Sequence, residues 1–192
     1  MDRTSILQKL IDKTITKKYL EIGMGPGVNY NSLVCDYKLC VDPNPTVPVT
    51  HKMTSDEFFE QNKEMFGVIF IDGLHWSDQV YKDILNSLNV LSSGGYVVCH
   101  DINPHSEIIQ KYPQAIPESE WTGDCWKAWV KIRQERSDLN MFVIDTDYGC
   151  GVISRGNQTV LPVNEELTWD LLDKNRKELL NLISIEKFNS II

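Results

Sequence analysis

The sequence contains no apolar run that approaches the ~20 residues needed to cross a bilayer. Residues 1–18 are polar and charged, and they lack the apolar segment of a signal peptide. These two absences argue against the membrane-spanning and secreted classes. We expect a soluble, cytoplasmic protein without a membrane partner.

Basic residues are also in short supply. Lys and Arg number 19 against 27 Asp and Glu, and the formal net charge is −8. Nucleic-acid affinity depends largely on Lys and Arg side chains that release counterions from phosphates. We therefore expect no nucleic-acid partner.

The five cysteines are odd in number and show no C-x-x-C spacing. Most lie inside apolar runs, where cysteine behaves as a small hydrophobic residue. This pattern predicts buried free thiols in a reducing compartment. Internal repeats, low-complexity segments and long linkers are lacking too. One domain is therefore expected over residues 1–192, with a core at about 18–156 and helical extensions at both ends.

The most informative stretch lies at residues 18–27, where a short apolar strand leads into alternating glycines. Gly23, Gly25 and Gly27 let the backbone turn sharply and approach a ligand closely. Glu21 places a carboxylate just before the turn, where it would repel a phosphate. The combination points to a nucleotide-like ligand and away from a phosphate.

Asp42 follows the next predicted strand, residues 37–41, where prolines end that strand. Ligands of open α/β sheets bind outside the carboxyl ends of the strands, and an acid after the second strand can accept both hydrogen bonds of a ribose diol. A simple turn or cap residue is the alternative interpretation of Asp42.

Short apolar runs alternate with helical patterns along the chain, which is typical of parallel strands joined by right-handed crossovers. A tight turn at 147–149 predicts that the last two strands form an antiparallel hairpin. The expected fold is α/β, Rossmann-like and doubly wound, with a mostly parallel seven-stranded sheet and an antiparallel C-terminal hairpin. Predicted strands are 19–22, 37–41, 48–53, 66–72, 96–101, 140–146 and 151–155; predicted helices are 4–15 (capped by Thr4 or Ser5), 28–34, one starting at 54–57, 77–91, 121–136 and the tail 164–192.

Two of these strands end in polar residues that suit catalysis. The apolar strand 66–72 is followed by His75, and the strand 96–101 ends in His100 and Asp101. Imidazole titrates close to working pH, so either histidine is a candidate general base, with a hydrogen-bonded structural role as the alternative. Strand alternation predicts that His100 turns inward while Asp101 faces the opposite way, toward the rim.

Several motifs together resemble the class I S-adenosylmethionine (SAM)-dependent methyltransferases. They are Glu21-Ile-Gly-x-Gly-x-Gly27, Asp42, Phe70-Ile-Asp-Gly-x-His75 and Gly94-Gly95 before a later strand. Within this class the chain is similar to the group whose fourth strand ends in Ile-Asp-Gly-x-His, which includes many bacterial small-molecule and sugar O-methyltransferases. The resemblance covers roughly residues 18–156 and implies a SAM-dependent enzyme.

The resemblance also implies roles for individual residues. The glycines would contact the amino-acid and ribose portions of SAM, Asp42 its ribose hydroxyls, and Glu21 would order the loop and attract the ammonium group. Ser55 would lie near the adenine. The full cofactor set implied is Glu21, Gly23, Gly25, Gly27, Asp42, Ser55, Asp72 and Gly73. His75 would be the general base or a substrate ligand, with His100 and Asp101 as further catalytic candidates.

A related set of O-methyltransferases depends on a metal, which makes Mg²⁺ a further candidate cofactor. Asp72 and Asp101 stand at adjacent strand ends and offer the hard oxygen ligands that Mg²⁺ prefers, with Asn103 as a third ligand. The fit is incomplete, because that set has another Asp or Asn immediately after the second acid, where this chain has Ile102.

Aromatic residues near the expected rim are candidates for substrate contact. Trp121, Trp126 and Tyr148 are proposed for this role because aromatic surfaces stack on sugar rings, and because a loop before the helix at 121–136 could close over the acceptor. Trp126 and Trp129 are three residues apart, a spacing that is most often core packing.

The sequence therefore predicts O-methylation of a small polar acceptor such as a sugar or glycan precursor. The C-terminal helix either packs on the sheet or forms a homodimer contact. One alternative is a SAM-binding module without turnover. A second is an NAD(P)-binding oxidoreductase, whose fingerprint is G-x-G-x-x-G leading into a full helix. This chain instead has G-x-G-x-G with Pro26 inside and little helix after it.

Overall fold

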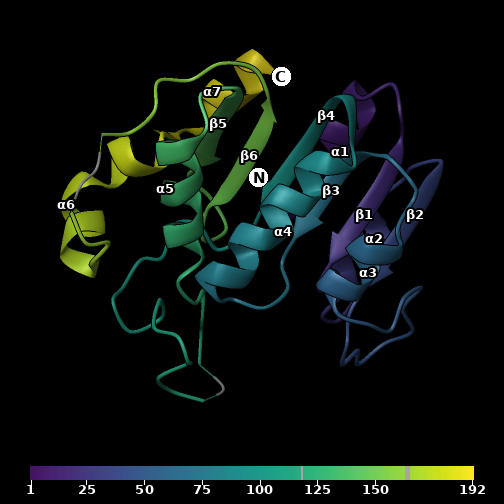
Figure 1. The fold of residues 1–192 in the computed structure, drawn as a ribbon, viewed down its shortest axis with the longest axis horizontal. Helices are drawn as coiled ribbons and strands as arrows, with labels where there is room; N and C mark the ends of the chain where they lie inside the picture. Colours follow the sequence, from purple (N-terminus) through teal and green to yellow (C-terminus); the bar gives the residue numbers. More distant parts are fainter. Residues whose placement is uncertain (118, 163–164) are drawn as a thin grey trace.

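The structure is a computed structural model that describes residues 1–117, 119–162 and 165–192. Its strands form one mixed sheet in the order β2-β1-β3-β4-β6-β5-β7 (Figure 1). Strands β1 to β4 pair in parallel, β6 is antiparallel to both β4 and β5, and β7 is parallel to β5. The predicted fold is thereby confirmed. The strands are β1 (Lys18–Ile22), β2 (Tyr37–Val41), β3 (Phe66–Ile71), β4 (Leu91–Cys99), β5 (Leu139–Ile144), β6 (Cys150–Arg155) and β7 (Leu182–Ile183).

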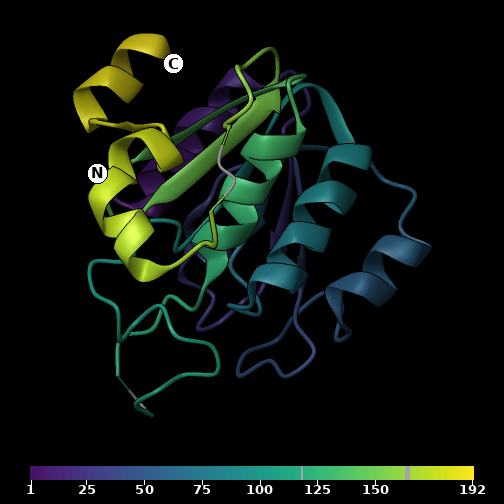
Figure 2. The same cartoon turned by 60° about the vertical axis from the view of Figure 1, so that its left-hand side comes forward.

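Helices cover both faces of this sheet (Figures 1 and 2). On one face pack α3 (Ser55–Gln61), α4 (Ser77–Asn89), α5 (Cys125–Glu135) and α6 (Trp169–Leu180). On the other pack α1 (Arg3–Lys13), α2 (Val28–Ser32) and α7 (Ile185–Ile191).

The strand β3 shows why both faces need cover. Every residue in it is buried, and alternate side chains point to opposite layers. Ile69 and Ile71 belong to the core beneath α4 and α5, whereas Val68 and Phe70 belong to the core beneath α1. Both layers therefore anchor the end of β3, where the polar residues begin.

The strand predicted at 48–53 is not formed. His51 makes an isolated parallel bridge with Val41, and the Cys40 N–H donates to the Thr50 hydroxyl at 2.8 Å rather than to a backbone carbonyl. That side chain interrupts the ladder, and Pro48 has no N–H to extend it. The seventh strand is instead β7, which lies in the tail that was predicted to be helical.

Several helix ends lie a few residues from the predicted ones, and two of the starts have a clear local cause. Asp2, rather than Thr4 or Ser5, caps α1, because its carboxylate accepts the Ser5 N–H at 2.8 Å. The helix α5 starts only at Cys125, after Gly123, whose φ of +57° is left-handed. The predicted start of the tail helix at Asn164 lies outside the described residues.

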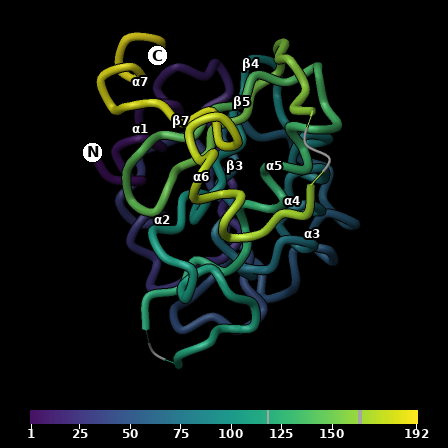
Figure 3. Tube along the Cα trace, turned by 90° about the vertical axis from the view of Figure 1, so that its left-hand side faces the viewer, coloured from purple at the N-terminus to yellow at the C-terminus, as the bar shows by residue number. Residues whose placement is uncertain are grey.

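The two ends of the chain meet on the α1 face. Figure 3 shows α7 beside α1. Phe188 of α7 is fully buried in the same core as the apolar side of α1, and the Lys9 ammonium donates to the Asn189 side chain at 2.6 Å. Packing within the chain is thus one use of the C-terminal helix, and a homodimer contact stays a prediction. Among the described residues, no helix combines the length and apolar character needed to cross a membrane.

Candidate active site

The glycine loop after β1 lies directly against the end of β3. Gly23 has a φ of +88°, and a Cβ there would lie 2.1 Å from the carbonyl oxygen of Asp72. Only glycine fits this approach, because the obstacle is backbone. Gly25 also has a left-handed φ, of +50°, but open space surrounds it. Gly27 precedes α2 and lines none of the three cavities described below.

A first cavity, of about 580 Å³, opens beside this loop at the carboxyl ends of β1, β2 and β3. Two backbone N–H groups orient the Asp42 carboxylate in it: Met24 donates to Oδ2 at 3.1 Å and Asn44 to Oδ1 at 2.8 Å. The structure thus brings together six of the eight predicted cofactor residues, namely Gly23, Gly25, Asp42, Ser55, Asp72 and Gly73.

Glu21 lines a second cavity, of about 330 Å³, on the other side of the glycine loop. Its side chain is almost fully buried, and the Tyr19 hydroxyl donates to it at 2.7 Å. Burial raises the pKa of the Glu21 carboxyl to about 7. A cation that enters this cavity would stabilise the ionised form of Glu21.

A third cavity, of about 340 Å³, lies at the ends of β3 and β4, where His75, His100 and Asp101 gather. Gly25 and Asp72 line all three cavities. A ligand in the first or second cavity therefore adjoins a ligand in the third.

His75 is held in this third cavity by contacts at both ring nitrogens. Nδ1 lies 3.2 Å from the Trp121 carbonyl oxygen and must donate to it. Nε2 lies 3.4 Å from Asp72 Oδ1 and 3.3 Å from Asp101 Oδ2. Burial opposes the charged form, but the two carboxylates outweigh it and raise the pKa of His75 above its usual value.

His100 and Asp101 do not face opposite ways as predicted. The strand ends at Cys99, and Asp101 has a left-handed φ of +62°, so strand alternation does not extend to it. Asp101 Oδ1 lies 3.1 Å from His100 Nδ1. Because only 3% of the His100 side chain is exposed, an acceptor has little access to its ring. The geometry favours the structural role for His100 over that of general base.

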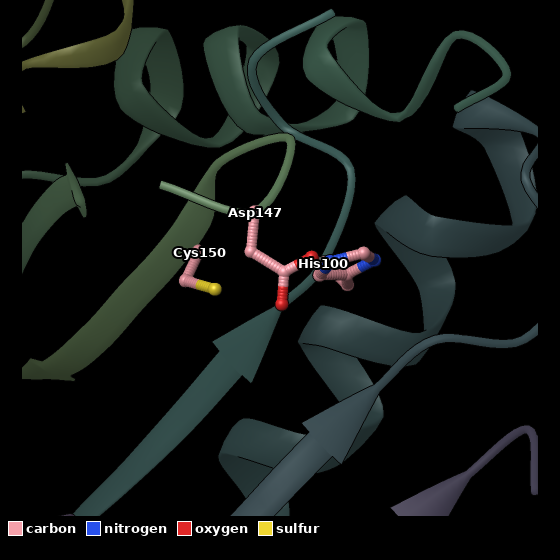
Figure 4. Close-up of side chains that lie close together, drawn as sticks. All are labelled: His100, Asp147 and Cys150. Carbon is pink, nitrogen blue, oxygen red and sulfur yellow. Dashed lines mark ion pairs between the residues drawn. The ribbon is translucent and has the colours of Figure 1, made fainter. Parts of the chain in front are cut away.

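The hairpin between β5 and β6 contributes Asp147 to the same cluster. Figure 4 shows its carboxylate between the His100 ring and Cys150, and Oδ1 lies 3.4 Å from His100 Nε2. The three side chains are close enough to share a metal ion. Burial raises the pKa of the Cys150 thiol to about 12, so this side chain is a neutral thiol when no metal is bound. We interpret the group as part of an ion-pair cluster.

Arg3, at the start of α1, joins the cluster from the N-terminal end of the chain. Its Nη1 lies 3.2 Å from Asp72 Oδ2 and 3.0 Å from His100 Nδ1, and its Nε lies 3.2 Å from Asp147 Oδ2. Burial opposes ionisation of His100, but Asp72 and the contacts with Asp101 and Asp147 raise its pKa well above the usual value. Arg3 and His100 thus share the carboxylates of Asp72 and Asp147.

Comparison with known proteins agrees with this geometry. A family model described as a methyltransferase domain matches residues 20–102, which contain the glycine loop, Asp42, Asp72 and His75. Residues 20–102 of this chain are therefore similar to a methyltransferase domain. The predicted enzyme class is thereby confirmed. A search of curated proteins finds no match.

Solved structures share the fold of this chain at low sequence identity. TomG of Streptomyces achromogenes, an O-methyltransferase of tomaymycin synthesis in complex with SAM, is 14% identical with a TM-score of 0.60, over 81% of this chain and 80% of its own. An O-methyltransferase of Bacillus cereus in complex with S-adenosylhomocysteine (SAH) is 14% identical with a TM-score of 0.59, over 79% of each chain. MycE, a methyltransferase of the mycinamycin pathway in complex with Mg, SAH and mycinamycin VI, is 14% identical with a TM-score of 0.51, over 86% of this chain and 50% of its own.

The predicted Mg²⁺ ligands each face a protein partner, although ligand atoms of Asp72, His75 and Asp101 lie within 4.8 Å of one another, close enough to share a metal ion. Asp72 Oδ2 faces the Arg3 guanidinium, and its Oδ1 faces both His75 and His100. The oxygens of Asp101 face the same two histidines. Asn103 is occupied elsewhere: its carbonyl oxygen accepts from Arg176 at 2.7 Å and its NH₂ donates to Asp145. Every predicted ligand group therefore already has a protein partner.

The aromatic residues predicted to contact substrate divide into two groups. Trp121 and Tyr148 line the third cavity, and the Trp121 ring lies 4.9 Å from that of His75. Trp126 is fully buried, and its indole N–H donates to Gln110 at 3.0 Å. Trp126 is therefore a core residue, as its spacing to Trp129 suggested, and its predicted substrate contact is wrong.

Arg3 and Asp147 were missed by the sequence analysis. Arg3 stands in an ordinary amphipathic helix, and Asp147 in a turn from which only Tyr148 was singled out. They lie 144 residues apart, and no local motif links them. The available signal was the hairpin itself, because a turn beside β4 must reach the same sheet edge as His100.

Proposed function

We propose that this chain is a SAM-dependent methyltransferase that acts on an oxygen of a small polar acceptor such as a sugar or glycan precursor. The observation that carries the proposal is the first cavity with six predicted cofactor residues, adjoining a third cavity that contains His75. The SAM and SAH complexes of the neighbouring structures support the cofactor. The acceptor rests on the resemblance and on the aromatic wall of the third cavity.

The residues of the chain have distinct tasks in this reaction. Asp42, already oriented by two backbone N–H groups, receives the ribose diol, and Glu21 faces the ammonium group. SAM supplies a sulfonium methyl group, whose carbon–sulfur bond breaks as the carbon–oxygen bond forms, leaving the electron pair on sulfur. His75 Nε2 takes the proton of the acceptor hydroxyl. Trp121 and Tyr148 hold the acceptor in line with the methyl group.

Titration with SAH and with NAD tests the cofactor. We expect SAH to bind with a micromolar Kd and NAD not to bind, because α2 has five residues and is too short to hold a pyrophosphate at its N-terminus. Asp42→Ala should lower the affinity for SAH by about tenfold or more, because the hydrogen bonds to the ribose are lost. Isothermal titration calorimetry measures both. Binding of NAD alone would overturn the proposal in favour of the oxidoreductase.

Glu21→Gln should separate stability from cofactor affinity. The carboxyl pKa is raised from 4.5 to about 7, so the folded chain holds this proton over a pH range in which the unfolded chain has lost it. The Glu21 carboxyl therefore leaves the free energy of unfolding unchanged below pH 4.5. Above pH 7 it lowers that free energy by its full amount, about 3 kcal/mol. The variant should unfold at a higher temperature than the wild type at pH 8 and at the same temperature at pH 4. It should nevertheless bind SAH about tenfold more weakly.

Calorimetric titration and thermal unfolding at both pH values check this prediction for Glu21. Wild-type affinity for SAH should also fall as the pH drops through about 7, because protonation removes the charge that faces the ammonium. The matched control is Glu64→Gln, an exposed glutamate whose partner is Lys18. If Glu21→Gln binds SAH as the wild type does, Glu21 has no part in the cofactor site.

A further inference from the structure

We propose that Arg3 supplies the positive charge that metal-dependent O-methyltransferases take from Mg²⁺, so that this domain works without a divalent cation. The proposal rests on the proposed function, because it assigns the group that binds the acceptor oxygen. Arg3 lies outside residues 20–102, the part of the chain that matches the methyltransferase family.

The guanidinium faces one oxygen of Asp72, a carboxylate that could serve as a metal ligand together with His75 and Asp101. Nη1 lies 3.2 Å from Asp72 Oδ2, the one oxygen of that carboxylate that faces no histidine. Nε pairs with Asp147 at 3.2 Å, and the Arg3 backbone N–H donates to the same Asp147 oxygen at 3.1 Å. A divalent ion bound through Asp72 Oδ2 would have to displace this guanidinium.

Basic side chains already surround the carboxylates of the cluster. Asp72, Asp101 and Asp147 face Arg3, His75 and His100. A divalent ion that bound these carboxylates would have to compete with the groups that they already hold.

The backbone around Arg3 holds it in place. The Thr4 hydroxyl donates to Asn29 at 2.6 Å, which ties the first turn of α1 to α2, and the Thr146 hydroxyl donates to the Met1 carbonyl at 2.7 Å. The start of α1 is thus fastened to the glycine-loop side and to the β5–β6 hairpin. Such an arrangement presents a cation at a fixed position.

Arg3 also has donors left for a ligand. Its guanidinium offers five N–H groups, and within the described part of the chain Nη2 makes no hydrogen bond. Arg3 lines the second cavity as well as the third, where it lies with His75, Trp121 and Tyr148. Two N–H groups on Nη2 fit an acceptor with two neighbouring oxygens, such as a vicinal diol. Their charge would lower the pKa of the hydroxyl whose proton His75 takes.

Metal binding and metal dependence give the first test. We expect calorimetry to detect no binding of Mg²⁺ up to about 5 mM, with or without SAH. This concentration is above the dissociation constants of even weak divalent-cation sites in proteins. Turnover should be unchanged after exhaustive chelation. Saturable Mg²⁺ binding, or turnover that is lost in chelator and restored by Mg²⁺, would overturn the assignment. The titration needs no acceptor, so it remains decisive for Arg3 even when no transfer is detected; absence of SAH binding would instead count against the proposed function.

Substitution of Arg3 gives the second test. Arg3→Gln should lower kcat/KM for the acceptor by about 10²-fold or more, and Arg3→Lys by less, while the Kd for SAH stays within about threefold. Lys13→Gln, which removes an exposed cation from the same helix, is the matched control and should behave as the wild type. A different result would be a loss of SAH affinity by tenfold or more in Arg3→Gln, with turnover restored by saturating SAM. In that case Arg3 binds the cofactor carboxylate, and the proposal is wrong. Should Arg3→Gln fail to fold, Arg3→Lys decides between the same two results.

Discussion

Replacing His75 by Ala should lower kcat/KM for methyl transfer by about 10²- to 10⁴-fold, the range typical of a lost general base. The ring stands in the third cavity with Nδ1 committed to the Trp121 carbonyl, so Nε2 is the nitrogen that can accept a proton. The affinity for SAH should stay within about threefold, because His75 does not line the first cavity. A transfer assay with a labelled methyl group, across hydroxylated acceptors, measures the rate.

The pH profile gives this prediction a second readout. Asp72 and Asp101 raise the pKa of His75, so wild-type kcat/KM should rise with pH and level off above the usual histidine value. The variant should lack that rise. His51→Ala, which removes an imidazole outside the three cavities, is the control. A fully active His75→Ala enzyme would refute the base assignment, and a wild type that binds SAH without any transfer would support the binding module.

Gly23→Ala is expected to abolish detectable SAH binding and to lower the free energy of unfolding by about 2–4 kcal/mol. The added Cβ would lie 2.1 Å from the Asp72 carbonyl oxygen and would force the ends of β1 and β3 apart. These strand ends carry the loop and the Asp72 side chain, so the first cavity should lose its shape. Urea denaturation and calorimetric titration measure the two effects.

The neighbouring glycine provides the comparison for this prediction. Gly25 has a left-handed φ of +50°, but nothing lies within 4 Å of its Cβ position. Gly25→Ala should therefore lose only about 1 kcal/mol of stability, the cost of backbone strain alone. Equal losses in the two variants would show that the contact with Asp72 does not explain the need for glycine at position 23.

Much of the site could be predicted because its residues sit at the ends of strands. Parallel pairing brings the carboxyl ends of β1, β2 and β3 to one edge, so Gly23, Asp42 and Asp72 had to meet once the strands were recognised. The same logic gave the correct neighbourhood of His75. The sequence position of a residue was sufficient to predict where its side chain lies wherever a regular strand continued up to that residue.

The prediction was wrong where regular backbone ended earlier than expected. Asp101 lies beyond the last residue of β4 in a left-handed conformation, so alternation assigned its side chain to the wrong side. The Thr50 hydroxyl accepts the Cys40 N–H in place of a backbone carbonyl, and the strand predicted at 48–53 is therefore not formed. Arg3 required knowledge of how the start of α1 packs between the glycine loop and the hairpin, and such long-range packing leaves no local pattern.

The conformation of Tyr148 has a consequence for engineering. Its φ is +57°, a region that costs an ordinary side chain about 1 kcal/mol and glycine almost nothing. A screen for thermal stability would consequently tend to enrich glycine at position 148. The enriched variants would melt later and would have lost an aromatic wall of the third cavity. Selection of improved forms of this enzyme should therefore score turnover on the acceptor, since resistance to heat alone rewards the removal of a side chain from the proposed acceptor site.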